Sequence, residues 1–389
     1  TFNSKGAWLR LCIPHTKSTQ RDLMSGCSSL LRTIVTILGT DSQCEHTDSL
    51  QAMLHGHVAG FGNLPDSQSA TKNRRNWRSK ISRLTDQIWG TSDSAYLNSV
   101  LSTLDETQSK IVIGYWGTLP LPDLLAIKKA RPDVKVVLLL LCYPLALSHG
   151  GILRQDFYLR RAARFLDGIV FPSDLTEGYV RGRVFRTGFP PSVVIPPCWP
   201  RSFQATCELR RTAASPSLIF VGRTDMSSPT ATTADDVRPL MNSILGTGID
   251  LHHARSPETD DGHPHRRHFS PLPMRELIDK IGEFDASLIA YNTQGCARDD
   301  RFYLTIPDRL ITSVAAGVPV AIPRQGYGAI KSYLRDYPLL EFDTADELAQ
   351  TLADRSLVAK LREAAWNSRS NYDAALYSPA LAQFLNRLL

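Results

Sequence analysis

Short apolar segments alternate with helical patterns through the first half of this chain, and this alternation constrains the fold most strongly. The segment KIVIGY, Lys110 to Tyr115, predicts a strand, and the helical pattern after it ends at Pro132. Val134 to Cys142 is apolar apart from Lys135, as in a strand buried on both faces of a parallel sheet. A helix over about 155–166 and strands over 169–172 and 192–197 continue the pattern. Strands that alternate with helices predict a parallel sheet covered by helices.

The N-terminal region is expected to add one strand and one helix to this domain. Trp8 to Ile13 is predicted as the first strand. A helix is expected to open near Cys27 and to stop at Gly39. Apolar residues recur in it at helical spacing: Leu30, Leu31, Ile34, Val35 and Ile37. The polar segment from Thr40 to Gln68 predicts no definite element.

The second half of the chain predicts a second α/β unit. A polar, alanine-rich stretch from Pro200 to Ser215 reads as a linker. The predicted elements after it are a strand over 215–225, a helix over 273–281, a strand over 285–291, a helix–turn–strand unit over 306–323 and a helical tail over 346–389. With 389 residues, the chain suits two domains of roughly 150 to 200 residues each.

Composition excludes several protein classes. Apolar residues make up 42% and charged residues 21% of the chain, which argues against a disordered or fibrous protein. The apolar run from Val136 to Leu147 is interrupted by Pro144 and is too short to cross a bilayer. No signal-peptide pattern opens the sequence, so we expect cytoplasmic residence. The seven cysteines show no C-x-x-C spacing, which predicts neither a disulfide framework nor a zinc site.

Two arginines stand where an anionic ligand is expected in a doubly wound domain. Arg223 follows the end of one predicted strand, and Arg309 opens the helix that follows another. Ligands of such domains lie beyond the carboxyl ends of the strands. One guanidinium group can donate two parallel hydrogen bonds to phosphate oxygens, and a helix N-terminus favours negative charge. These residues therefore predict a diphosphate site. The alternative is that each arginine forms a surface ion pair, with Asp225 or Asp308.

At this point the sequence resembles the glycosyltransferases with two Rossmann-like domains known as GT-B. The segments IFVGR, EFDASLIAYN and IPDRLITSVAAGVPVAIP look like the nucleotide-sugar-binding domain of that superfamily, including family 4 and the xanthan glucuronosyltransferase group. LRRAARFLDGIVFPSD followed by VVIPP is similar to the end of their N-terminal domain. The resemblance covers roughly residues 110–365. It implies a doubly wound acceptor domain over 1–205, a doubly wound nucleotide-sugar domain over 206–373 facing it across a crevice, and a C-terminal helix over 374–389 that packs back on the first domain.

The same resemblance implies the donor site. Gly222 with Arg223, and Asp308 with Arg309, would hold the diphosphate of a nucleoside-diphosphate sugar, UDP- or GDP-linked. Tyr291 and Asn292 would line the base or ribose pocket. The two glutamates that retaining members carry are replaced here by Leu304 and Thr312, so the stereochemical course stays open. The family implies no cofactor and no metal ion.

An inverting transferase needs a base that deprotonates the acceptor hydroxyl, and we expect the first domain to supply it. His149 and Asp156, after the strand that ends near Cys142, are the candidates, with His15 as a third. A structural role for each of these side chains is the alternative.

Two polar segments are further candidates for binding. Lys72 to Arg83 carries six basic residues around Trp77, and Arg74, Arg75, Trp77 and Arg78 are expected to contact an acceptor or an anionic membrane. A solvated loop is the alternative. DNA binding is a further alternative, and this segment is the one feature that favours it. His252 to His268 is rich in histidine, but it lacks zinc-type spacing and is expected to be a polar loop.

The function expected from the resemblance is transfer of a sugar to a saccharide, a lipid-linked or another hydroxyl acceptor, in polysaccharide biosynthesis. The protein would act in the cytoplasm or on the inner face of the membrane. A nucleotide-sugar 2-epimerase, which needs no acceptor, and a non-catalytic module that binds a nucleotide sugar or a partner are the alternatives.

Overall fold

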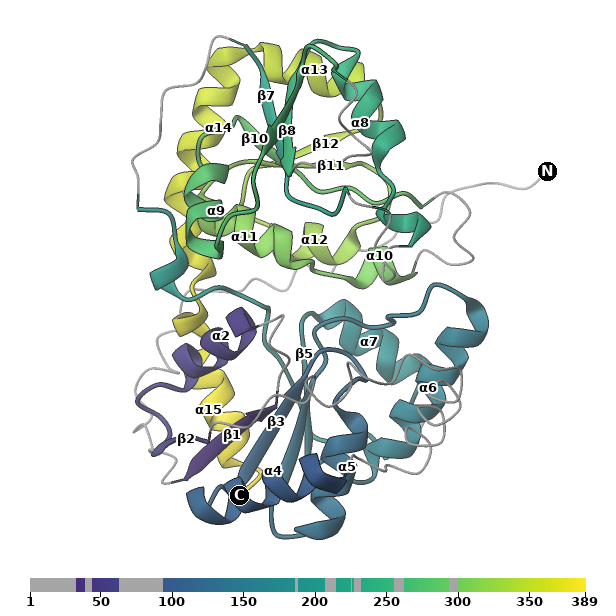
Figure 1. Cartoon of the computed structure of the whole chain (residues 1–389), viewed down its shortest axis with the longest axis vertical. Coiled ribbons are helices and arrows are strands. Elements are labelled where there is room, and N and C mark those ends of the chain that lie inside the picture. Colours follow the sequence, from purple (N-terminus) through teal and green to yellow (C-terminus); the bar gives the residue numbers. More distant parts are fainter. Residues whose placement is uncertain are drawn as a thin grey trace, which may run out of the picture.

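The computed structural model describes residues 33–38, 44–62, 94–185, 188–206, 215–224, 226, 232–254, 262–293 and 300–389. These residues form two sheets of six strands each, in which all paired strands run parallel. Helices cover the sheets, and the two units lie one above the other in Figure 1. The predicted class, two doubly wound Rossmann-like domains, is confirmed.

The first sheet has the strand order β2-β1-β3-β4-β5-β6. Its strands are β1 Ile34–Leu38, β2 Gly60–Gly62, β3 Ile111–Tyr115, β4 Lys135–Leu139, β5 Gly168–Phe171 and β6 Ser192–Val194. The helices between them are α2 Cys44–Leu54, α4 Ser94–Thr107, α5 Leu121–Ala130, α6 His149–Ala163 and α7 Asp174–Arg183. The chain builds outward from β1 to β2 and then restarts at β3 on the other side, so the strand order reverses between β1 and β3.

The second sheet has the order β12-β11-β10-β7-β8-β9 and reverses between β7 and β10. Its strands are β7 Ser217–Phe220, β8 Asp250–Ala254, β9 Arg266–Phe269, β10 Ala286–Leu288, β11 Val320–Pro323 and β12 Leu339–Phe342. Its helices are α8 Arg238–Leu245, α9 Met274–Ile281, α10 Asp300–Leu304, α11 Asp308–Ala316, α12 Gly328–Tyr333, α13 Ala345–Ala353 and α14 Arg355–Ser368. Helices α10, α11 and α12 form the side of this domain that faces the first one (Figure 1).

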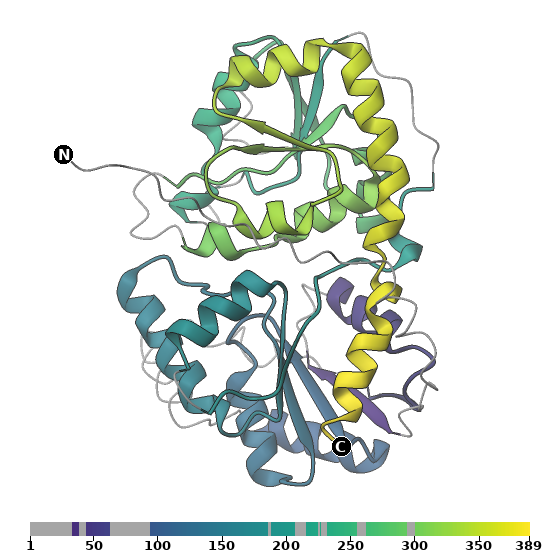
Figure 2. The same cartoon turned by 180° about the vertical axis from the view of Figure 1, so that it is seen from behind.

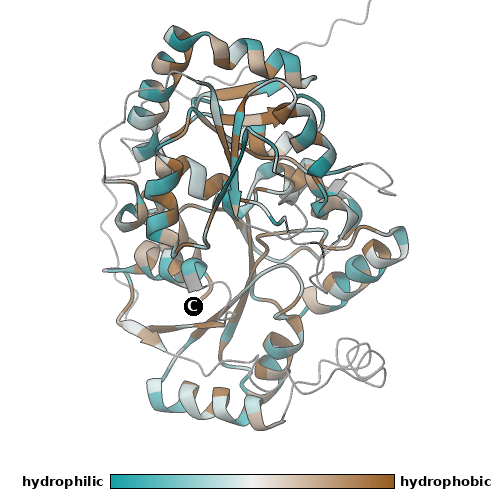
Figure 3. Ribbon diagram, turned by 45° about the horizontal axis from the view of Figure 1, so that its top comes forward, coloured by the Kyte–Doolittle hydropathy of each residue, from teal (hydrophilic) through white to brown (hydrophobic). Residues whose placement is uncertain are grey.

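Alternate residues of each central strand pack on opposite helical layers. In the first domain Val112 and Val136 pack with α4, α5, α6 and α7, whereas Ile111 and Val137 pack with α2 and the C-terminal helix. The second domain has the same plan, with α9, α11 and α12 on one face and α8 and α13 on the other. Hydrophobic residues, brown in Figure 3, therefore gather on the strands and on the helix faces that cover them.

The C-terminal segment returns to the first domain. After α14 the chain passes through short 3₁₀ turns at Arg369–Tyr372 and Ala374–Tyr377 into α15 Ser378–Asn386, coloured yellow in Figure 2. Phe384 of α15 is buried in the core that β1, β3 and β4 share, and the Ser378 hydroxyl donates a hydrogen bond to the Met53 carbonyl of α2. The last helix is therefore a structural part of the first domain.

Three expected elements differ from the structure. Ile34 to Leu38 is strand β1 rather than the end of a helix, because four of its residues are buried and it pairs with strands on both sides. The β-branched residues Ile34, Val35, Thr36 and Ile37 favour that conformation. The predicted strand Trp8–Ile13 lies outside the described residues.

The histidine-rich segment is not simply a polar loop, because its two ends are strands β8 and β9. His253 of β8 is buried, with its Nδ1 donating to the Ala254 carbonyl, and the Arg266 guanidinium of β9 donates to Asn242 Oδ1 over 2.8 Å. Since these polar groups satisfy each other, a strand forms without an apolar pattern. Residues 255–261 lie outside the described part.

Helix α6 begins at His149, six residues before the expected start near Gln155. Ser148 is the N-cap, and its hydroxyl oxygen accepts a hydrogen bond from the Gly151 N–H over 3.2 Å. The cap satisfies a backbone donor that would otherwise be free, so the helix includes Gly150 and Gly151. His149 consequently lies in a helical first turn rather than in a loop.

Candidate functional site

The candidate site lies where the carboxyl ends of β7 and β10 meet the first turn of α11. Pro307 precedes α11, Asp308 and Arg309 open it, and Gly317 ends it with φ 70° in the left-handed region. The expected helix–turn–strand unit is therefore present. Within the described residues, no side chain caps the start of α11, so its first backbone N–H groups are available to an anionic ligand.

Arg309 is held against both strands by its side chain. Its Nη2 donates to the Ala290 carbonyl over 2.7 Å, and its guanidinium carbon lies 4.2 Å from the ring centre of Tyr291. Nε is buried and has no hydrogen-bond partner in the described part of the chain. A buried donor without a partner costs free energy, so the Arg309 guanidinium has hydrogen-bonding capacity that the described residues do not use.

Gly222 allows this position of Arg309. A Cβ atom at residue 222 would lie 2.4 Å from Arg309 Nη1 and 2.2 Å from Phe220 Cζ. Real Cβ atoms do not approach other atoms so closely, so only glycine fits here. Gly222 and Arg309 therefore form one structural unit at the carboxyl end of β7.

Tyr291 and Asn292 follow β10 at the same edge. The Tyr291 N–H donates to Tyr327 Oη over 3.0 Å, and the two rings stack 6.3 Å apart. Burial raises the pKa of Tyr291, and the Arg309 charge opposes this shift. The Asn292 N–H donates to the Ala234 carbonyl in the 3₁₀ turn Thr233–Asp235, which brings that turn beside the site.

Arg223 is exposed next to Gly222. Its Nη1 lies 4.0 Å from Asp235 Oδ2, a carboxylate that also accepts a hydrogen bond from the Thr232 N–H. An exposed pair at this distance is weak, so Arg223 can turn toward an anion. Its alternative partner Asp225 lies outside the described residues.

Asp308 contacts the first domain rather than Arg309. His46 Nε2 of α2 donates to Asp308 Oδ1 over 3.0 Å. The His46 ring is buried, with the Trp199 ring centre 4.9 Å away and the Tyr115 and Trp116 ring centres each 5.9 Å away. This contact joins the two domains at the first turn of α11.

Sequence reasoning missed His46, because the residue lies in the polar segment that predicted no element. Its partner is 262 positions away in the chain, and no local pattern reports such a pair. A lone histidine whose aromatic neighbours come from two distant segments gives no signal before the chain folds.

The positions that replace the family glutamates also contact the first domain. The Leu304 carbonyl accepts a hydrogen bond from Thr176 Oγ1 over 3.2 Å, and Thr312 Oγ1 accepts one from Trp199 Nε1 over 3.1 Å. Nearby, Arg301 Nη1 donates to the Leu145 carbonyl over 3.0 Å. These residues hold the domains together beside the site.

The predicted bases lie elsewhere in the first domain. Asp156 is buried and accepts hydrogen bonds from the Tyr143 hydroxyl and from Arg183 Nε, each over 2.6 Å. Desolvation raises the pKa of Tyr143, and the hydrogen bond to Asp156 adds to the shift. With both carboxylate oxygens engaged, Asp156 has the surroundings of a structural residue. His149 is exposed at the start of α6, and His15 lies outside the described residues.

The basic segment from Lys72 to Arg83, including Arg74, Arg75, Trp77 and Arg78, also lies outside the described residues. In the part that the structure describes, no helix is both long and apolar enough to cross a membrane. The same part contains no group of three or more histidine, cysteine or acidic residues arranged to hold a metal ion.

The comparisons with known proteins show the fold. No family model and no curated protein sequence matches this chain. Sucrose-phosphate synthase from Thermosynechococcus elongatus is similar in structure, with TM-score 0.62 and 11% identity over 92% of this chain and 99% of that one. An α,α-trehalose 6-phosphate synthase from Burkholderia multivorans has TM-score 0.60 and 11% identity over 92% and 97%. A trehalose-6-phosphate structure from E. coli, bound with UDP-2-fluoro glucose, has TM-score 0.59 and 10% identity over 92% and 99%. These likenesses confirm the two-domain GT-B fold that the motifs indicate.

Proposed function

We propose that this GT-B protein transfers a sugar from a nucleoside-diphosphate donor, bound by the second domain, to a hydroxyl acceptor at the first. The observation that carries the proposal is the position of Arg309. Its guanidinium lies against Gly222 at the point where the strand order reverses. Among the described residues it has one buried donor without a partner, and no side chain caps the helix start beside it. A diphosphate fits such a combination of cation and helix N-terminus.

The residues of the site can stabilise the leaving group. In the transfer, the bond between the anomeric carbon and the diphosphate oxygen breaks, and a bond to the acceptor oxygen forms. Negative charge then grows on the diphosphate, where Arg309, Arg223 and the α11 N-terminus lie. Fixed donors aimed at developing charge are the largest contribution in many enzymes. We propose that these groups serve without a metal ion.

Tyr291 and Asn292 are proposed to contact the nucleoside. The Tyr291 ring contacts both Arg309 and Phe302, with ring centres of Tyr291 and Phe302 4.6 Å apart. These contacts restrain the ring and suit it to form one wall of the pocket. The nucleotide bound by the E. coli structure is a uridine diphosphate sugar, and UDP- or GDP-linked donors are our proposal for this chain.

The acceptor proton needs a base, and His46 joins His149 and Asp156 as a candidate. His46 belongs to the first domain and contacts the first turn of α11 through Asp308, whereas Asp156 is occupied by Tyr143 and Arg183. Glutamine variants of His46 and His149 separate the two, because loss of the base lowers kcat by about 10²–10⁴-fold. Unchanged kcat in the His46 variant would exclude His46.

The acceptor class follows from the resemblance. We propose a saccharide or lipid-linked acceptor in polysaccharide biosynthesis, with the protein in the cytoplasm or on the inner face of the membrane, and with Arg74, Arg75, Trp77 and Arg78 as acceptor or membrane contacts. We propose no role in nucleic-acid modification.

A thermal-shift screen with UDP, GDP, ADP, dTDP and CMP tests the donor site. A ligand at about 100 times its Kd stabilises the folded state by about 2.7 kcal/mol, so a true donor nucleotide raises Tm measurably. We expect the rise to disappear in Arg309→Ala and to persist in Arg387→Ala, which removes an exposed arginine of the C-terminal segment.

A turnover assay then completes the test. With the sugar form of the nucleotide found in the screen, release of nucleoside diphosphate in the presence of acceptors measures transfer. Normal turnover in Arg309→Ala would contradict the proposal. Nucleotide binding without turnover for any acceptor would support a binding module, and conversion of the donor alone would support an epimerase.

A further inference from the structure

Helix α6 exposes two large apolar side chains one turn apart. Leu153 and Phe157 are each 51% exposed, whereas Ile152, Tyr158 and Leu159 on the other side of the helix are buried in the domain. Residues four positions apart lie on the same face of a helix. The pair therefore forms an apolar strip that faces away from the core.

Arginine residues flank this strip on both sides. At 100° per residue, four of them project within about 60° of Phe157 around the helix axis: Arg154, Arg160, Arg161 and Arg164. The one acidic residue of α6, Asp156, points inward and is paired with Arg183. The exposed face of α6 therefore combines apolar and positively charged groups without a carboxylate of its own.

Three of these arginines, Arg154, Arg160 and Arg164, have no carboxylate partner among the described residues. Arg160 donates from Nε to the Val184 carbonyl over 2.7 Å and from Nη2 to the Arg183 carbonyl over 3.3 Å, and both acceptors are neutral. The Arg164 guanidinium lies 4.8 Å from the Phe165 ring centre. Arg154 and Arg164 form no ion pair within the part that the structure describes.

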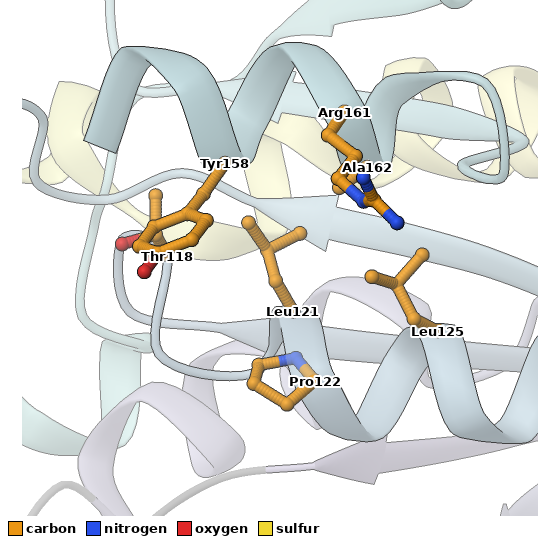
Figure 4. Close-up of a pocket in the computed structure, with 7 residues that line it drawn as sticks. All are labelled: Thr118, Leu121, Pro122, Leu125, Tyr158, Arg161 and Ala162. Carbon is orange, nitrogen blue, oxygen red and sulfur yellow. The ribbon is translucent and has the colours of Figure 1, made fainter. Parts of the chain in front are cut away.

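An apolar recess adjoins the same face. It is a small recess between α5 and α6 that is partly open to solvent and lined mainly by apolar groups. Figure 4 shows Leu121 and Leu125 of α5 opposite Tyr158 and Arg161 of α6. Leu119, in the segment between β3 and α5, is 53% exposed. The recess and the strip extend the apolar surface beside the arginines.

We propose that the exposed face of α6 docks on the surface of an anionic lipid bilayer. A helix that carries an aromatic and an aliphatic side chain between arginines lies in the plane of a membrane interface, with the apolar groups among the acyl chains and the cations at the lipid phosphates. The combination favours a lipid surface over an acidic protein, because the apolar strip needs an apolar phase as well as opposite charge. The proposal does not depend on the reaction proposed above.

Sedimentation of the full-length chain with lipid vesicles tests the proposal. We expect binding to vesicles of phosphatidylcholine with added phosphatidylglycerol, and at least tenfold weaker partition onto phosphatidylcholine alone. Two double variants remove the two halves of the surface separately: Leu153→Ser with Phe157→Ser, and Arg154→Gln with Arg164→Gln. Each should lower partition onto the anionic vesicles by about tenfold or more.

A matched control isolates the surface. Leu376→Ser removes an apolar side chain that is 58% exposed in the turn Ala374–Tyr377, away from α6, and should leave binding unchanged. The substituted side chains are exposed, so circular dichroism should show native folding for every variant. The proposal is overturned if the wild type does not bind anionic vesicles, if it binds neutral vesicles equally, or if both double variants bind as the wild type does. The last result would assign lipid binding to another surface.

Discussion

Substitution of Gly222 by alanine tests whether Arg309 depends on a residue without a side chain. The new Cβ would lie 2.4 Å from Arg309 Nη1 and 2.2 Å from Phe220 Cζ. Phe220 is fully buried, and its ring has little space in which to retreat. We therefore expect the guanidinium to be displaced from the end of β7, together with its hydrogen bond to the Ala290 carbonyl.

The expected change in Kd follows from the contact between Arg309 and the diphosphate, which the displaced guanidinium no longer makes. A hydrogen bond to a charged group contributes about 1.5–3 kcal/mol, and each 1.4 kcal/mol is a factor of ten, so the Kd for a nucleoside diphosphate should rise by about 10- to 150-fold. Overpacking should lower the free energy of unfolding by about 1–3 kcal/mol. Binding should thus be lost while the protein stays folded.

Isothermal titration calorimetry with the nucleotide found in the thermal-shift screen measures the effect. Gly178→Ala is the matched control, because a Cβ at this position of α7 meets no atom within 4 Å. The control should bind as the wild type does. If a folded Gly222→Ala variant binds the nucleotide with unchanged Kd, then the position of Arg309 against Gly222 does not form the diphosphate site.

Two further predictions concern stability. Arg355→Ala should lower the free energy of unfolding by about 3 kcal/mol, because it removes the ion-pair partner of the Asp285 carboxylate, which is 1% exposed and receives two hydrogen bonds from Arg355. The Ser217 N–H and hydroxyl continue to donate to Asp285. Urea denaturation measures the loss, and a change below about 1 kcal/mol, as for a surface pair, would refute the prediction. Burial, aided by the Lys280 charge, lowers the pKa of His252 to about 4 from 6.5. As the pH drops, His252 therefore binds a proton in the unfolded state before it does so in the folded state, and wild-type stability should fall between pH 6.5 and 4. The fall should be smaller in His252→Gln than in the control His55→Gln, which changes an exposed histidine. Equal pH dependence in both variants would contradict the burial of His252.

Periodicity and turn chemistry were sufficient for the central elements. The strands at Lys110–Tyr115 and Val134–Cys142 and the unit from Ile306 to Pro323 were predicted close to their observed bounds, because buried parallel strands are continuously apolar and Gly317 must adopt a left-handed conformation. The same reasoning from apolar patterns failed in the histidine-rich segment, where the strands bury polar groups that bond to each other. Arg266 of β9 has its partners in other segments, Asn242 of α8 and His253 of β8, and a local pattern contains no information about them.

The prediction for strand β1 failed for a different reason. Five apolar or β-branched residues in a short segment fit a helix face and a strand equally well, and the decision depends on whether neighbouring strands are present to pair with it. The start of α6 was predicted too late because Gly150 and Gly151 have low helix propensity. The N-cap hydrogen bond to the Ser148 hydroxyl stabilises the helix enough to include them.

By itself, the sequence determined the two α/β units, the strand ends that carry Gly222 and Tyr291, and the helix that opens with Arg309, since each depends on residues close together in the chain. Only the tertiary structure decided that Arg309 lies against Gly222, that His46 reaches Asp308 from the other domain, that Asp156 is occupied by Arg183, and that α6 turns four arginines and an apolar pair outward. These relations join residues up to 262 positions apart, and they arise when the packing of whole layers fixes which side chains meet.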